Sequence, residues 1–340
     1  MSCTGTPETF TITVSPTPAA TATPASQTIC SGPISTIAIT GPVNNTTYNW
    51  TRDNTAGVTG IAASGSGDIS GSLINTTAAP LTVTFTITPT ANGCTGTPIT
   101  ATVIVNPIPV ATATPSSQTV CSGAITPINL ASTVTGTTYA WTRDNTVNVT
   151  GITASGSGSS ISGTLTNNTT VPQTVTFTIM PTSPDGCPGT PITATVTVNA
   201  VPTITCPANI VVGNDVNQCG AIVTYTPTVT GIPAPTVTYT LTGATTGSGN
   251  GNASGTFFNI GTTTVSLTAT NTCGTANCSF TVTVNDTQNP TITCPAPVTV
   301  SCVSAVPAVN TGSVTAADNC PGVVVTHRGD VISAQTCANR

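Results

Sequence analysis

Stretches of alternating apolar and polar residues recur along the chain. In LTVTFTITPT, the residues Leu81, Val83, Phe85 and Ile87 fall on one face, and threonines fall on the other. A period of two predicts a β-strand with one buried face, and threonine suits the exposed face of such a strand. The segments ITATVIVNP, TTTVSLTAT and CSFTVTVND alternate in the same way, with turn residues between them. Because no segment keeps a helical period, the pattern predicts an all-β fold of Ig-like β-sandwich domains.

The predicted strands belong to tandem repeats. The segment TTYNWTRDNT, beginning at Thr46, returns as TTYAWTRDNT at Thr137, a step of 91 residues (137 − 46). The segments SQTICSG and SQTVCSG, at Ser26 and Ser117, repeat with the same step. A period of this length suits one small domain and is too long for the unit of a solenoid. The expected boundaries are 1–16 for the last strand of a truncated repeat, 17–107 and 108–200 for two complete repeats, 201–287 for a third domain, and 288–340 for the first part of a fourth.

The repeated ten-residue segment holds both tryptophans of the chain. Trp50 has the strand parity of Tyr48, and Trp141 has that of Tyr139, so each pair points to one side of a predicted strand. Such a segment is either a ligand site made twice or a core strand of a domain that occurs twice. An Ig-like sandwich buries a tryptophan on its third strand, and burying an aromatic ring removes about 150–250 Å² from water. We therefore interpret these four residues as core.

Charge is scarce in this sequence. Charged residues make up 4% of the chain, lysine is absent, and the formal net charge is −5. Four basic residues cannot form the positive surface that nucleic-acid binding requires, and no apolar run reaches the roughly 18 residues of a membrane span. The only histidine, His327, lacks a catalytic partner motif, so we expect no enzyme activity and no catalytic residues. Scarce charge also leaves sheet edges unprotected, which favours self-association.

Short linkers join the expected domains. The segments VNPIPVATATP and VNAVPTITCP contain prolines, which hold the backbone near extended polyproline geometry. We therefore expect the sandwiches to be arranged as an extended rod. Asp286, in VNDTQNPTITCP, lies at a predicted junction and is the one candidate calcium ligand; the alternative interpretation is a solvated linker. No other cofactor is expected.

The 13 cysteines include no Cys-x-x-Cys pair, which argues against zinc binding and thioredoxin-like chemistry. Their positions near repeat ends predict disulfides and hence an oxidising, extracellular location at the cell surface. Each complete repeat holds two cysteines, so we pair Cys30 with Cys94 and Cys121 with Cys187. A closed loop of about 65 residues would stabilise each domain by roughly 4 kcal/mol in the chain-entropy model.

The third domain resembles a known extracellular family. Its opening TITCPANI, its later segment IGTTTVSLTAT and its closing CSFTVTVND are similar to the hyalin repeat, an Ig-like module, and a fourth domain opens with PTITCPAPVTVSC. The first two repeats resemble the PKD-like repeats that accompany hyalin repeats in very long surface proteins of Bacteroidota. The resemblance implies extracellular adhesion or cell-surface filament architecture, often with export by a type IX system. It implies no catalytic residues.

The third domain holds four cysteines, which allow three connectivities. In a sandwich the first and last strands start at the same end, which favours pairing the first cysteine of this domain with the last. The fourth domain lacks its closing strands, so some of its cysteines have no expected partner. The expected pairs are Cys206–Cys278, Cys219–Cys273 and Cys302–Cys337, with Cys294 and Cys320 unpaired.

These observations favour a structural function outside the cell. The first hypothesis is a stalk or filament segment of a large secreted bacterial surface protein, serving adhesion, surface attachment or motility. The second is a subunit that assembles with other copies into an ordered extracellular fibre. The third is a set of accessory carbohydrate-binding modules of a secreted enzyme, which would need exposed aromatic residues, and these are only 4% of the chain. The expected partners are other copies or domains of the same long chain, surface glycans and host surfaces, without nucleic acid.

Overall fold

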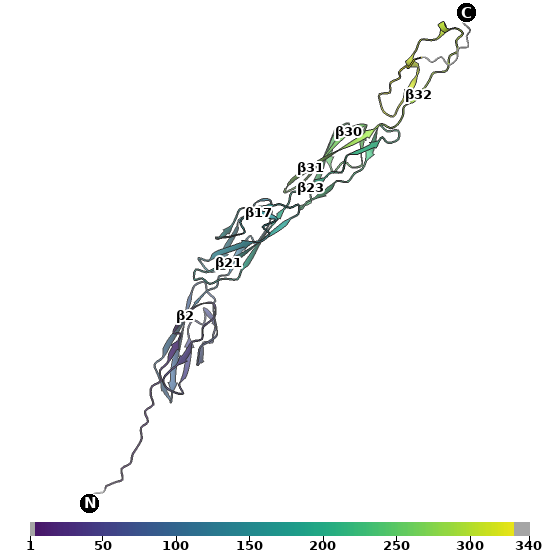
Figure 1. Ribbon diagram of the computed structural model, residues 1–340. Helices are drawn as coiled ribbons and strands as arrows, with labels where there is room; N and C mark the ends of the chain where they lie inside the picture. Colours follow the sequence, from purple (N-terminus) through teal and green to yellow (C-terminus); the bar gives the residue numbers. More distant parts are fainter. Residues whose placement is uncertain (1–3, 330–340) are drawn as a thin grey trace. The chain divides into compact units, whose positions relative to one another are not determined.

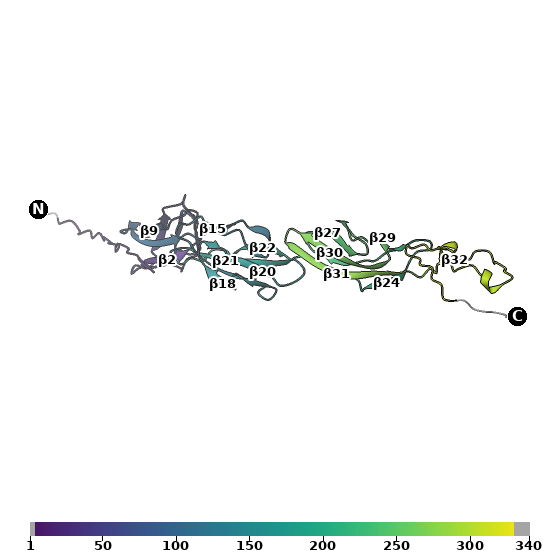
Figure 2. The ribbon, with the colours of Figure 1, turned by 90° about the horizontal axis from the view of Figure 1, so that it is seen from above.

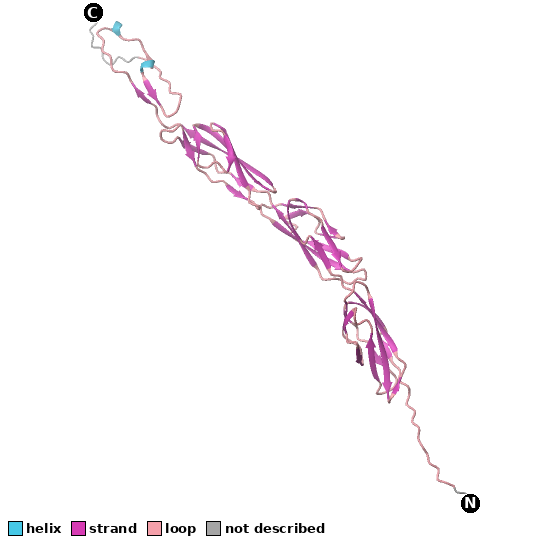
Figure 3. Ribbon diagram, turned by 180° about the vertical axis from the view of Figure 1, so that it is seen from behind, coloured by secondary structure: helices cyan, strands magenta, loops and turns pink. Residues whose placement is uncertain are grey.

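The computed structural model describes residues 4–329, and their backbone consists of strands, turns and loops (Figure 1). The helical residues of this range lie in two single 3₁₀ turns, η1 (Val303–Ala305) and η2 (Thr311–Ser313) (Figure 3). The chain divides into two compact units, with the division near Val198. The prediction of an all-β fold built from tandem Ig-like sandwiches is confirmed.

Three sandwich modules follow one another along the described chain. The strands of the first module are β1 (Thr21–Thr23), β2 (Ser26–Cys30), β3 (Gly32–Pro33), β4 (Ala38–Thr40), β5 (Thr47–Arg52), β6 (Val58–Gly60), β7 (Ser64–Ser66), β8 (Ser72–Asn75), β9 (Leu81–Ala91), β10 (Cys94–Thr95) and β11 (Ile99–Asn106). Those of the second are β12 (Ala111–Thr114), β13 (Ser117–Cys121), β14 (Gly123–Ala124), β15 (Ile128–Ser132), β16 (Thr138–Arg143), β17 (Val149–Gly151), β18 (Ser155–Ser157), β19 (Ser160–Ile161), β20 (Thr164–Asn167), β21 (Gln173–Thr182) and β22 (Ile192–Asn199). Those of the third are β23 (Thr203–Thr205), β24 (Ile210–Gly213), β25 (Gly220–Val223), β26 (Thr228–Thr230), β27 (Thr236–Gly243), β28 (Gly247–Asn250), β29 (Thr256–Asn259), β30 (Gly261–Asn271) and β31 (Gly274–Asn285). A hairpin-like pair, β32 (Thr291–Thr293) and β33 (Thr315–Ala317), comes after the third module.

The first two modules share one strand plan. The main sheet has the order β2-β11-β9-β5-β7 in the first module and β13-β22-β21-β16-β18 in the second. A smaller sheet, β3-β8-β6 or β14-β20-β17, belongs to each. Strand β2 runs parallel to β11, with Ser26 opposite Thr102 and Cys30 opposite Asn106. This register places Cys30 beside the last strand residue, at the end where the chain leaves the module.

The third module keeps the same main sheet with the order β24-β31-β30-β27-β28, and Figure 2 shows β27, β30 and β31 together in it. Strand β24 again runs parallel to the last strand, with Gly213 opposite Asn285. Strand β25 pairs with β29, and β23 pairs with β26. The segment after β24 therefore starts at the end of the module where β31 finishes.

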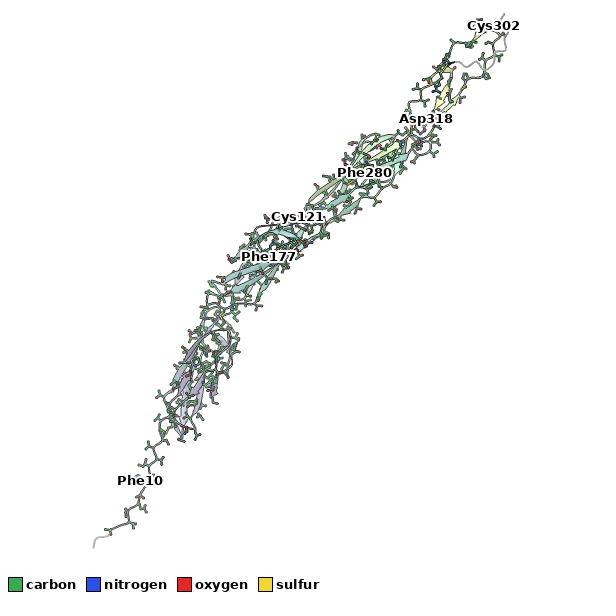
Figure 4. All side chains as sticks on the ribbon, viewed as in Figure 1. Phe10, Cys121, Phe177, Phe280, Cys302 and Asp318 are labelled. Carbon is green, nitrogen blue, oxygen red and sulfur yellow. A yellow bond between two sulfur atoms is a disulfide. The ribbon has the colours of Figure 1, made fainter. Side chains whose placement is uncertain are left out.

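The long strands fill the cores by alternation, as their sequences predict. On β9, Val83, Phe85 and Ile87 are fully buried, while most of the intervening threonines stay at least partly exposed. On β21, Val175, Phe177 and Ile179 take the same places, and Phe177 is labelled among the side chains of the second module in Figure 4. The apolar faces of these strands leave water on folding, which is the main stabilisation of each module.

The first residues differ from expectation. A last strand was predicted over residues 1–16, but residues 4–20 of the structure contain no strand. An alternating sequence forms a strand only where a neighbour completes the hydrogen-bond ladder, and no described strand pairs with this segment. Phe10 is accordingly 85% exposed (Figure 4).

Candidate functional site

The repeated tryptophans lie in the module cores. Trp50 on β5 is 8% exposed, its ring meets that of Phe85 edge-on at 5.7 Å, and its Nε1 donates to the carbonyl of Gly67 at 3.1 Å. Trp141 on β16 has the same exposure and the same edge-on contact with Phe177 at 5.7 Å. Edge-on packing of this kind adds to the burial energy of the rings. The rings are core side chains and cannot serve as open binding platforms.

The tyrosines beside them are not equivalent. Tyr139 is buried with the second core, and its burial raises the pKa of its hydroxyl. Tyr48 is only partly buried, and it packs against the first core from the edge. Both thus belong to the packing of the sandwich.

The arginines that follow the tryptophans join two sheets through backbone carbonyls. On Arg143, Nε donates to the Ile152 carbonyl at 2.6 Å, and both terminal nitrogens donate to that of Val149 at 3.1 Å. Arg52 makes the matching bonds in the first module, with distances of 2.7 Å and 3.1 Å. Burial lowers the pKa of both guanidinium groups, but an arginine stays charged at every physiological pH. These charge-assisted bonds therefore tie β5 to β6 and β16 to β17 across the sandwich.

The Asp-Asn pair that completes the segment closes the end of the same strand. Asp53 Oδ1 accepts from the backbone N–H of Thr84 at 2.7 Å, and Asn54 Nδ2 donates to the carbonyl of Thr82 at 2.6 Å. Asn54 has φ of +54°, a left-handed conformation that asparagine tolerates well. Asp144 repeats the first contact, on Thr176 at 2.7 Å. The Arg-Asp-Asn part of the repeated segment is thus a structural clasp, which ties the end of the core strand to neighbouring strands.

One disulfide joins the first module to the second. Cys30 and Cys187 are bonded, with their Cα atoms 5.6 Å apart and a sequence separation of 157 residues. Cys30 ends β2, and the next residue, Ser31, donates its backbone N–H to Asn106 at the end of β11. Cys187 is fully buried in the connection between β21 and β22, where its N–H donates to Ser183 Oγ. The bond therefore links the exit end of one module to a hairpin of the next.

This bond corrects the predicted pairs Cys30–Cys94 and Cys121–Cys187. Val105 pairs with both Ile29 and Leu81, so Cys30 lies near the start of β9, whereas Cys94 pairs with Ala91 at its far end. Ten strand residues span about 33 Å, and a disulfide needs Cα atoms within about 7 Å. The two cysteines of a module are therefore at opposite ends and cannot meet. Cys94 is a partly exposed thiol, and Cys121 is disulfide-bonded.

In the third module, Cys206 and Cys278 are bonded, with Cα atoms 5.7 Å apart. This is the pair that the sequence favoured. The other expected pair is wrong, because Cys219 is a thiol while Cys273 is disulfide-bonded. The reason repeats that of the first module: Cys219 follows β24 at the end where β31 finishes, and Cys273 lies in the hairpin at the opposite end of β30.

The cysteines after the third module are described in part. Cys294 and Cys302 are exposed thiols, and Cys337, the expected partner of Cys302, lies outside the described residues. Cys320 is a partly buried thiol. Its burial, the neighbouring Cys219 thiol and the nearby Asp286 carboxylate raise the pKa of the Cys320 thiol to about 12.

Asp286, the candidate calcium ligand, has a local structural contact. Its Oδ1 accepts from the backbone N–H of Gln288 at 3.1 Å, which forms a tight turn after β31. Within residues 4–329, no group of three or more His, Cys, Asp or Glu side chains is arranged to hold a metal ion. None of the described helices has the length and apolar character needed to cross a membrane.

Two ranges of the chain match the model of a known domain family. The family model of the PKD-like domain matches the chain twice, over residues 27–109 and 118–202. The matched ranges cover most of the first and second modules. No curated protein matches the chain.

Several solved structures are similar to the chain in part. The N-terminal eight Ig domains of Down Syndrome Cell Adhesion Molecule align with 15% identity and a TM-score of 0.42, over 76% of this chain and 36% of that one. The I-band fragment I67–I69 from titin aligns with 12% identity and a TM-score of 0.40, over 80% of this chain and 100% of the fragment. Drosophila N-cadherin EC1–4 aligns with 9% identity and a TM-score of 0.33, over 77% and 73%. The chain thus spans about a third of the length of the first of these proteins.

Proposed function

We propose that this chain is a structural stalk or filament segment of a large secreted bacterial surface protein that serves adhesion, surface attachment or motility. Its modules supply length and tensile strength, and no catalysis takes place in them. The observation that carries the proposal is the disulfide between Cys30 and Cys187, which makes two successive modules covalently continuous outside the backbone. A disulfide of this kind persists in an oxidising extracellular setting.

The strand plan supports resistance to axial load. In the first module, the early strand β2 and the last strand β11 are parallel neighbours joined over five residue pairs. When the two ends of the module are pulled apart without the Cys30–Cys187 bond, these strands slide past each other, so their hydrogen bonds must break together instead of one at a time. Strands β24 and β31 provide the same arrangement in the third module.

A fibre made by self-assembly is the second candidate, and a specific surface favours it. Ile222 on β25 and Phe257 on β29 lie directly opposite each other and are 61% and 41% exposed. Adjacent exposed apolar side chains on a sheet with few charges favour contact with a second copy. The partners in this case are other copies of the same chain.

The experiment that separates these functions is small-angle X-ray scattering combined with sedimentation of the oxidised chain over a hundredfold concentration range. A stalk segment gives an elongated monomer whose radius of gyration is well above the roughly 20 Å of a compact 340-residue globule and does not change with concentration. The paired variant Ile222→Thr and Phe257→Thr leaves this result unchanged. Concentration-dependent growth that this variant abolishes would establish the fibre, and a compact monomer would contradict both functions.

A further inference from the structure

A second pair of cysteines meets beyond the third module. Cys219 lies in the segment that follows β24, at the end of the module where β31 finishes, and Asn214 in this segment donates its N–H to the carbonyl of Asn285. Cys320 lies three residues after β33. Cys219 thus lies at the end of its module where the last strand finishes, as Cys30 does in the first module.

A hydrogen bond between their chain neighbours brings the two cysteines close together. The side chain of Asn319 donates from Nδ2 to the carbonyl of Gln218 at 2.7 Å, although the two residues are 101 positions apart. Gln218 and Asn319 are the chain neighbours of Cys219 and Cys320, and Asn319 Nδ2 also donates to Cys320 Sγ at 3.4 Å. Both thiols are partly buried, in contrast to the exposed Cys294. The bond between Gln218 and Asn319 therefore brings the two cysteines close together.

We propose that Cys219 and Cys320 form a disulfide bond in the secreted protein, and that this bond is a second covalent link between consecutive parts of the chain. This inference rests on the extracellular location in the proposed function, because the bond requires an oxidising setting. The Cys219–Cys320 and Cys30–Cys187 bonds would then share one arrangement. In each, a cysteine at the exit end of one module is bonded to the part of the chain that follows.

The chemistry balances with a small disulfide as the oxidant. One thiolate of the pair attacks a sulfur of oxidised glutathione, forms a mixed disulfide and releases one glutathione thiolate. The second cysteine, as thiolate, then attacks the protein sulfur of the mixed disulfide and releases the second glutathione. The two protein thiols lose two protons and two electrons in total, and one oxidised glutathione becomes two reduced glutathione molecules. Because the thiol of Cys320 is held protonated, we expect the reaction to accelerate as the pH rises.

The test is disulfide mapping of the full chain, folded in a glutathione redox buffer at pH 8.5. Remaining thiols are blocked with iodoacetamide, and the chain is digested with thermolysin, because a chain with four basic residues gives few tryptic fragments. Mass spectrometry without reduction is expected to find one cross-linked species that contains Cys219 and Cys320. The variant Cys320→Ser is expected to leave Cys219 alkylated, whereas the matched control Cys294→Ser keeps the cross-link.

The outcome separates this inference from the proposed function. If Cys206 and Cys278 are bonded while Cys219 and Cys320 both carry the alkyl label, or if Cys219 is bonded to another cysteine, the inference is wrong and the stalk function is unaffected. If protein isolated from its natural source carries Cys206 and Cys278 as thiols, the extracellular location itself is contradicted.

Discussion

The disulfide between Cys30 and Cys187 gives a direct prediction about how tension passes through the first two modules. When force is applied at Ala19 and Val201 of the full chain, the covalent path runs from Cys30 through the disulfide to Cys187. The residues between these cysteines lie outside that path. When both modules unfold, the molecule therefore extends by less than the full contour length of the unfolded residues. The double variant Cys30→Ser and Cys187→Ser removes this shortcut.

The magnitude follows from the sequence separation. The bond spans 157 residues, and an extended chain gains at most about 3.5 Å per residue. The disulfide therefore prevents up to about 550 Å of extension. In the chain-entropy model, closing a loop of this size also stabilises the folded state by about 5 kcal/mol. A surface substitution changes neither the extension on unfolding nor the folding stability by a comparable amount.

Optical-trap measurements with handles attached at Ala19 and Val201 test this reasoning. The double variant is expected to extend by about 500–550 Å more than the oxidised wild-type chain when both modules unfold. The wild-type chain in a reducing buffer is expected to behave as the variant does. If the oxidised wild-type chain and the variant give equal extensions, tension does not pass through the disulfide and the reasoning is refuted.

Three further substitutions test the cores and the clasp. A Cβ at Gly65 would collide with the ring of Trp50, so Gly65→Ala should destabilise the first module by about 1–3 kcal/mol in urea unfolding, while Gly247→Ala, at an open position, should change nothing measurable. Arg143→Met leaves buried carbonyls without donors, so we expect a loss of about 3 kcal/mol in the second module, and a wild-type unfolding midpoint would contradict the clasp. Burial raises the pKa of Tyr225 to about 12, so its contribution to stability is complete below pH 10 and is lost as the pH rises through about 12. Tyr225→Phe should flatten that dependence in unfolding curves taken from pH 8 to pH 11, and an unchanged slope would exclude this cause.

The local features of the fold could be predicted from the sequence. Alternation identified β9 correctly, because every second side chain of a strand with one buried face points into the core and is apolar. The core position of Trp50 followed from the tryptophan that an Ig-like sandwich buries on its third strand. The cysteine pair Cys206–Cys278 followed from the common starting end of the first and last strands.

The links between modules could not be predicted in the same way. Counting two cysteines in each repeat favoured Cys30–Cys94, yet the ends of the sheet at which the two residues lie depend on strand register, which counting ignores. The role of Arg52 was also missed, because its acceptors are the carbonyls of Val58 on β6 and of Ile61 just after it, six and nine residues away. The arginine and its Asp-Asn neighbours repeat together at the end of a core strand, and this repetition was the available signal for a structural clasp.

The measurement that tests the central claim most directly is the identity of the residue bonded to Cys30 in protein isolated from its natural source. The account predicts a cross-linked peptide that joins Cys30 to Cys187, and a Cys94 that pairs with neither of them. A cross-link between Cys30 and Cys94 would confine the disulfides to single modules. That result would contradict the claim that successive modules share a covalent load path.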